Sequence, residues 1–136
     1  MPDYEPRAEE KEAAGRSFLR LVHSNNKIFK VGRCADDGRG GLKDRDMYDG
    51  CEGIRTIWTG APGKASWLEK WLTRSAWKRY PDRCLNEKAG GGPCGEDPDH
   101  HVYVVLWAPT PDLAEDVQLT RLLRDIDTFV EAATKG

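Results

Sequence analysis

Residues 101–107 constrain the fold more than any other part of this chain. They read His-Val-Tyr-Val-Val-Leu-Trp, a nearly continuous run of β-branched, aromatic and aliphatic side chains. A strand with one face in water alternates polar and apolar residues, whereas a continuous apolar run indicates a strand that is buried on both faces. We therefore expect this segment to form the central strand of a sheet.

Three further strands are predicted, at residues 18–22, 27–31 and 53–58. The turn Ser24-Asn25-Asn26 separates the first two, which are therefore predicted to pair as a hairpin. The apolar side chains of residues 18–22 also have helical spacing, so a helix there is the alternative interpretation. The strand is preferred because residues 27–31 need a partner on the other side of the turn.

Two long helices are predicted at residues 66–80 and 112–134. The first begins with Ser66-Trp67-Leu68-Glu69, a capping-box pattern, and Pro81 ends it. Its predicted inward face consists of Leu68, Trp71, Leu72 and Ser75. The second helix carries one apolar stripe, which consists of Leu119, Leu122, Leu123, Ile126, Phe129 and Val130.

These elements predict an α/β (α+β) sandwich, in which helices cover a small three- to four-stranded sheet. A chain of 136 residues has the size of one domain. Residues 1–12 are charged and spaced by prolines, so we expect a frayed or disordered tail there and a single domain over residues 13–136. No apolar run is long enough to span a membrane and no signal-peptide core is present, which predicts a cytoplasmic or otherwise intracellular protein without membrane contact.

The chain has four cysteines, Cys34, Cys51, Cys84 and Cys94. Inside a cell they are expected to be reduced thiols, with a Cys84–Cys94 disulfide as the alternative. Cys84, Cys94, His100 and His101 contain the ligand types for zinc. Zinc is disfavoured because these residues lack the tight Cys-x2-4-Cys pair of most zinc modules.

The formal net charge is −2, but the middle of the chain is basic. Residues 27–88 contain 14 Lys and Arg against 9 Asp and Glu, a net charge of +5. Within this region Lys70, Arg74 and Lys78 recur every four residues and share one helix face beside Trp77. Such a stripe contacts phosphates while the indole stacks on a base, or it is simply a solvated helix face.

Lys30-Val31-Gly32, at the end of a predicted hairpin strand, resembles the second motif of the GIY-YIG nuclease superfamily, in the form found in phage-type relatives. The resemblance covers roughly residues 17–103 and implies a GIY-YIG-like domain that acts on or binds nucleic acid. The family's reactive tyrosine falls on Leu19, and its helix arginine falls on Gly41. Binding of nucleic acid is therefore expected more strongly than its cleavage.

The resemblance implies a catalytic site of Arg39, Glu69 and Asn86, with Glu69 holding Mg²⁺ or Mn²⁺ for a metal-dependent endonuclease reaction. Lys43, beside the displaced arginine position, is expected to join Lys70, Arg74, Trp77 and Lys78 in contacting nucleic acid. Each site residue also has a structural interpretation. Glu69 is the last residue of the capping box, Asn86 is a common turn residue, and Arg39 lies in a glycine-rich loop.

Five tryptophans keep a non-catalytic, lectin-like glycan-binding protein open as the alternative function. Trp58, Trp71 and Trp107 have apolar neighbours and are expected in the core. Trp67 and Trp77 are expected to be exposed, where an indole ring stacks on the apolar face of a sugar. Salt dependence separates the two functions, since phosphate contacts weaken with salt and stacking on a sugar does not.

Overall fold

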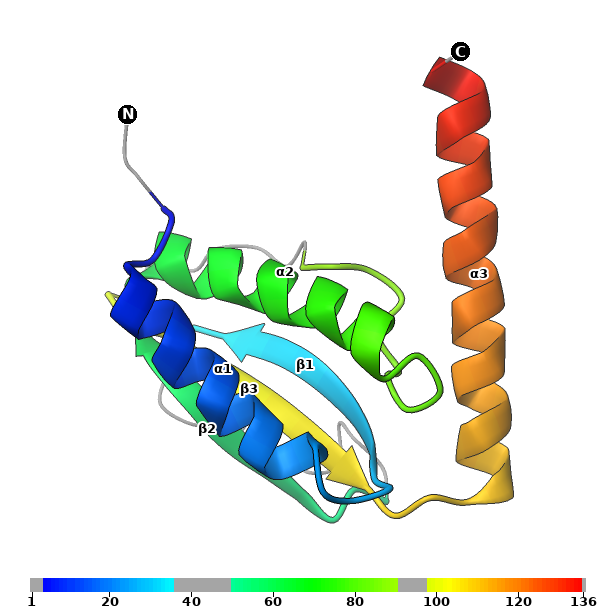
Figure 1. Ribbon diagram of the computed structural model, residues 1–136, viewed down its shortest axis with the longest axis horizontal. Helices are drawn as coiled ribbons and strands as arrows, with labels where there is room; N and C mark the ends of the chain where they lie inside the picture. The colour runs from blue at the N-terminus through cyan, green and yellow to red at the C-terminus, as the bar shows by residue number, and fades with distance from the viewer. Residues whose placement is uncertain (1–3, 36–49, 91–97, 136) are drawn as a thin grey trace.

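The computed structural model describes residues 4–35, 50–90 and 98–135. In chain order the elements are α1 (Ala8–Val22), β1 (Ile28–Cys34), β2 (Gly53–Gly60), α2 (Pro62–Arg79), β3 (His100–Trp107) and α3 (Pro111–Lys135) (Figure 1). The strands form a three-stranded antiparallel sheet of order β1-β3-β2. The protein thus has an α+β fold, as the sequence predicts.

The central position of β3 is confirmed, since this strand pairs with both β1 and β2. Val102, Val104 and Leu106 are buried on one face of the sheet, together with residues of α1 and α2. Tyr103, Val105 and Trp107 are buried on the other face, where Val117 of α3 joins them. Helices α1 and α2 therefore lie over the same face of the sheet, and α3 begins beside the opposite one (Figure 1).

The predicted hairpin is wrong, because residues 18–22 belong to helix α1. Ala14, Phe18 and Val22 recur every four residues and are the buried positions of this helix, so helical spacing outweighs local strand preference. Strand β1 takes its partner from β3 instead. The helix starts at Ala8, inside the segment 1–12 that the sequence assigned to a tail.

Helix α2 begins at Pro62, which makes the predicted capping box at Ser66 wrong. Proline is favoured in the first turn because the missing N–H has no helical partner there. Of the predicted inward residues, Leu68 and Leu72 are buried while Trp71 and Ser75 are only partly buried. Ala65, Thr73 and Ala76 complete the buried face. Glu69 consequently lies inside the helix, away from its N-terminus.

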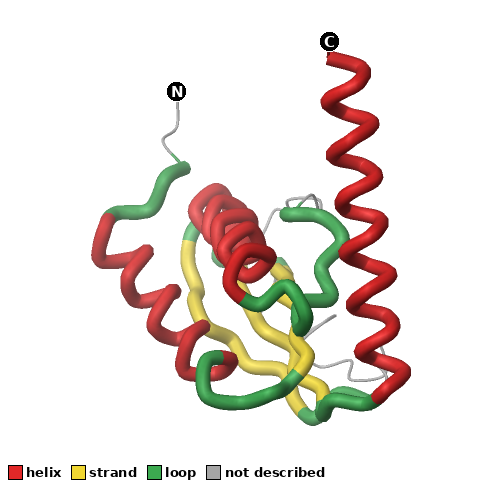
Figure 2. The backbone as a smooth tube through the Cα atoms, turned by 45° about the vertical axis from the view of Figure 1, so that its right-hand side comes forward, coloured by secondary structure: helices red, strands yellow, loops and turns green. Residues whose placement is uncertain are grey.

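Helix α3 matches its predicted range closely, but the described part of its apolar stripe is exposed. Leu119, Leu122, Leu123 and Ile126 are 57%, 55%, 40% and 48% exposed. In two views the C-terminal half of α3 extends past the rest of the described chain (Figures 1 and 2). Phe129 and Val130, the other predicted stripe residues, lie in the part of α3 whose side chains are not described.

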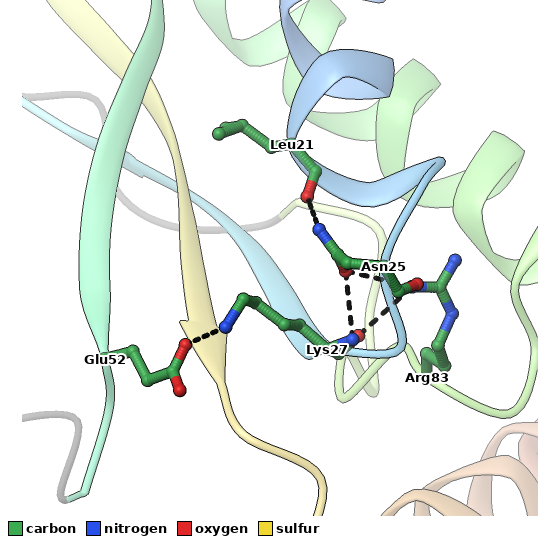
Figure 3. A network of polar contacts seen from close by, with 5 residues as sticks. All are labelled: Leu21, Asn25, Lys27, Glu52 and Arg83. Carbon is green, nitrogen blue, oxygen red and sulfur yellow. Dashed lines mark hydrogen bonds and ion pairs between the residues drawn. The ribbon is translucent and has the colours of Figure 1, made fainter.

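The segment that follows α2 lies along the outer edge of β1. The Phe29 N–H donates to the Arg83 carbonyl at 2.8 Å, and the Leu85 N–H donates to the Phe29 carbonyl at 2.9 Å. The Arg83 guanidinium also donates to the carbonyl of Val22, the last residue of α1, at 2.8 Å. It donates as well to the carbonyl of Asn25 in the following turn (Figure 3). One segment thus satisfies backbone groups of both the strand edge and the helix end.

Candidate functional site

An open pocket of about 560 Å³ lies between β1, α2 and the segment after α2. Two of the predicted site residues, Glu69 and Asn86, line it, and so does the predicted motif Lys30-Val31-Gly32. Arg39 and Lys43 lie outside the described residues. Arg33 and Lys88 add positive charge to the lining, and the sequence did not single them out. The structure therefore gathers in one place residues that the family resemblance connected.

Gly32 lets the wall of this pocket form. It pairs with Tyr103 across the β1–β3 ladder, and a Cβ atom on Gly32 would lie 2.5 Å from the Tyr103 ring. No side chain is accommodated at that distance without moving the ring. The glycine of the Lys30-Val31-Gly32 motif is thus required for the Tyr103 ring to lie against β1.

Glu69 reaches the pocket as the partner of Arg33. The Arg33 Nε lies 3.3 Å from Glu69 Oε1, and the two side chains are 4% and 12% exposed. Burial raises the pKa of Glu69, and the nearby Arg33 guanidinium opposes this shift without cancelling it. The carboxylate is therefore part of a buried ion pair and not of a capping box.

His100 extends this pair into a row of three side chains. Its Nδ1 lies 2.7 Å from Nη1 of Arg33. Because a guanidinium only donates hydrogen bonds, Nδ1 is the acceptor in this contact. The sequence offers one clue to this arrangement, namely a histidine at the start of a strand that is buried on both faces.

Asn86 has a structural role in the pocket. Its Oδ1 accepts the Val31 N–H at 2.8 Å, and its Nδ2 donates to the Val31 carbonyl at 2.8 Å. The side-chain amide therefore pairs with β1 as another peptide group would. The Trp77 indole N–H donates to the Asn86 backbone carbonyl at 3.0 Å, which fixes the same residue to α2.

The described residues contain no ready-made cluster of metal ligands. No group of three His, Cys, Asp or Glu side chains in the described ranges lies close enough to hold a metal ion. The Glu69 carboxylate accepts from Arg33, and the Asn86 side-chain oxygen accepts from Val31.

The alternative disulfide between Cys84 and Cys94 is also not formed. Cys84 is a free thiol with no exposed surface, and its burial raises its pKa to about 11. Cys94 lies outside the described residues. The Cys84 thiol instead donates to Oδ1 of Asn86 at 3.4 Å, so it adds to the packing behind the pocket.

Lys70, Arg74 and Lys78 form what we call the basic ridge, and all three are exposed on the outer face of α2. The ridge adjoins the pocket, because a Cβ atom on the pocket residue Gly90 would lie 2.7 Å from Lys70 Cγ. The only acidic residue of α2 is Glu69, whose charge Arg33 offsets. The outer face of α2 is consequently positive along its length.

The two tryptophans predicted to be exposed are partly buried. Trp77 lies under the Arg124 guanidinium, whose carbon is 4.9 Å from the ring centroid. Trp67 packs against Trp71 with ring centroids 5.7 Å apart, and the Lys11 ammonium lies 4.9 Å from its ring. Both indole rings are thus engaged within the protein. Among the tryptophans expected in the core, Trp107 is buried, whereas Trp58 and Trp71 are partly buried.

Comparisons with protein families, curated proteins and solved structures found no match. The class that the fold itself defines is an α+β protein with helices on a three-stranded sheet. Within residues 4–135, no described helix is both long and apolar enough to cross a membrane. The pocket and the basic ridge are therefore the features of the molecule that bear on its function.

Proposed function

We propose that the protein binds nucleic acid, with the basic ridge on the phosphate backbone and an adjoining nucleotide in the pocket. One observation carries the proposal: the ridge and the pocket adjoin at Lys70 and Gly90. A GIY-YIG-like site would lie at the same place, because Lys30-Val31-Gly32, Glu69 and Asn86 all line this pocket. Nucleic acid is thus the ligand that both the charge and the resemblance favour.

The spacing of the ridge suits a polyanion. Lys70 and Lys78 are eight residues apart, which is about 12 Å along a helix at 1.5 Å per residue. Three exposed cations along that length match a chain of phosphates better than a single small anion. Phosphate contacts carry no sequence information, so we expect binding with little base preference and strong salt dependence.

Binding is proposed without cleavage. Glu69 would be the metal-holding carboxylate of a GIY-YIG-like endonuclease, and its Oε1 already accepts from Arg33. A cleavage assay with Mg²⁺ and with Mn²⁺ tests this part of the proposal. The appearance of cut products that the Glu69→Gln variant does not yield would show that the protein is an active nuclease.

Binding is tested by fluorescence anisotropy with labelled single- and double-stranded oligonucleotides from about 50 to about 200 mM salt. Three phosphate contacts predict that log K falls with log salt at a slope of about −2 for single strands and about −3 for duplexes. Lys70→Ala, Arg74→Ala and Lys78→Ala should each weaken binding and make the slope shallower by roughly one contact.

Arg55→Ala is the matched control, since Arg55 is an exposed arginine on β2 and should leave the affinity unchanged. Absence of binding at low salt, or binding that salt does not affect, would overturn the proposal. The lectin-like alternative is tested by applying the wild type, Trp67→Ala and Trp77→Ala to a glycan array. Salt-independent glycan binding that either substitution removes would replace nucleic acid as the ligand.

A further inference from the structure

The apolar stripe of α3 is a helix face without a partner among the described residues. We call Leu119, Leu122, Leu123 and Ile126 the exposed stripe, and each is at least 40% exposed. The opposite side of α3 packs on its own domain, where Val117 is fully buried and Thr120 is 7% exposed. Large apolar side chains gathered on one exposed face mark an interaction surface.

Acidic residues lie on α3 just before the exposed stripe. Glu115 and Asp116 precede Leu119 by four and three residues, so they share its side of the helix. Both are exposed. Asp112 lies one turn earlier, in the first turn of α3. A surface that covers the stripe should therefore be apolar and should carry positive charge beside the apolar part.

A second pocket of the protein has these properties. It measures about 480 Å³ and lies between the C-terminal half of α1 and the last turn of α2. We call it the arginine groove, and its lining consists of Arg16, Leu19, Arg20, His23, Ser24 and Arg79. Leu19 supplies an apolar wall, and the aliphatic stems of the arginines extend it while their charged ends reach the rim.

The charge at this rim is only partly balanced within the chain. Arg16 pairs with Glu12 at 2.5 Å. Neither Arg20 nor Arg79 pairs with a carboxylate among the residues that the structure describes. His23 Nδ1 lies 3.1 Å from the Tyr80 hydroxyl oxygen, which holds the imidazole at the groove. Two exposed guanidinium groups thus remain available to acidic residues of a partner.

We propose that the exposed stripe of α3 docks into the arginine groove of a second copy of this chain, with Glu115 and Asp116 against Arg20 and Arg79. The occupant is a second copy because α3 is held to its own domain by Val117 and Thr120, and by Arg124 on Trp77. The exchange is reciprocal, so two copies form a closed dimer with two equal contacts. The basic ridge is not part of the groove, which leaves nucleic-acid binding as a separate function.

Sedimentation equilibrium of the full chain tests the proposal, and a wild-type protein that stays monomeric at all concentrations overturns it. The wild type should form dimers. Leu122→Asp should raise the dimer dissociation constant about tenfold or more, and so should Arg20→Glu combined with Arg79→Glu. Circular dichroism of each variant shows whether its fold is intact. Arg55→Glu, a charge reversal away from both surfaces, should leave the dimer unchanged.

A charge exchange separates docking from misfolding and from simple helix pairing. One chain carries Arg20→Glu and Arg79→Glu, and the other carries Glu115→Arg and Asp116→Arg. Each should be monomeric alone, while their mixture should form a heterodimer because both of its contacts join opposite charges. A dimer that the groove substitutions leave unaffected would show that the stripes pair with each other, and this result would also overturn the proposal.

Discussion

Helices α2 and α3 are both amphipathic, yet among the described residues the apolar face of α2 is buried and that of α3 is exposed. The buried face of α2 has the large side chains Leu68 and Leu72 in the middle and the small ones of Ala65 and Ala76 on either side, which pack against the sheet. The face of α3 that carries Leu119 and Leu122 has more large apolar residues, and they stay 40% to 57% exposed. The strength of an apolar pattern therefore shows that a face needs a partner, and it does not show where the partner lies.

The largest expected effect on stability is at the buried face of α2. Leu68→Ala should lower the free energy of unfolding by about 2–5 kcal/mol, because it leaves a cavity beneath α2. Leu122→Ala makes the same chemical change at an exposed position and should cost about 0.5 kcal/mol or less. Urea unfolding at low protein concentration measures both. Equal losses would mean that α3 is covered within the single chain.

A second prediction concerns the polar contacts that flank α2. Asn86→Ala removes both hydrogen bonds to Val31 and leaves a buried N–H and a buried carbonyl unpaired. Each unpaired group should lower the free energy of unfolding by roughly 1–3 kcal/mol. Glu87→Ala, at the exposed neighbouring position, is the control and should have little effect. A loss for Asn86→Ala no larger than for the control would contradict the pairing with β1.

The raised pKa of Glu69 makes the stability of the α2 region depend on pH. Above about pH 4.5 the unfolded chain releases the Glu69 proton before the folded protein does. The folded state then binds more protons, so the free energy of unfolding falls until the pH passes the raised pKa. Glu69→Gln should remove this fall in urea unfolding from pH 4 to pH 8. An unchanged pH profile in Glu69→Gln would contradict the buried position of this carboxyl group.

The smallest effect, with the opposite sign, is expected at Glu10 on α1. The Arg7 backbone N–H, followed by the Lys64 ammonium of α2, lowers the pKa of Glu10 to about 2. Its contribution to stability is present above pH 4.5 and is lost as the pH falls from 4.5 toward 2. Glu10→Gln should make acid unfolding between these values less steep, as circular dichroism can follow. Glu9→Gln, one residue earlier in the same helix, is the control.

The sequence predicted the elements whose patterns extend over many residues. The β3 prediction succeeded because an apolar run buried on both faces has few other interpretations. The α3 prediction succeeded because its apolar stripe extends over several turns. Residues 18–22 are too short for the same reasoning, and their membership of α1 becomes clear only when Ala14 is counted with Phe18 and Val22.

The site could be predicted only in part. Glu69 and Asn86 were placed together by family resemblance, and they do line one pocket. Their partners were not foreseen, because the contacts of Glu69 with Arg33 and of Asn86 with Val31 join residues 36 and 55 positions apart. Local spacing carries no information about such contacts. The antiparallel register of β1 on β3, which brings Arg33 near His100, is decided by the whole sheet.

The position of β3 in the sheet has a consequence for how the protein is made. Strands β1 and β2 flank β3, which is the last of the three described strands in chain order, and β3 is the strand that joins them into one sheet. During synthesis both flanking strands therefore leave the ribosome before their common partner, and neither completes a ladder until residues 100–107 have emerged. Cotranslational folding should consequently stay limited to local helix formation until that point, and the sheet should then form in one late step.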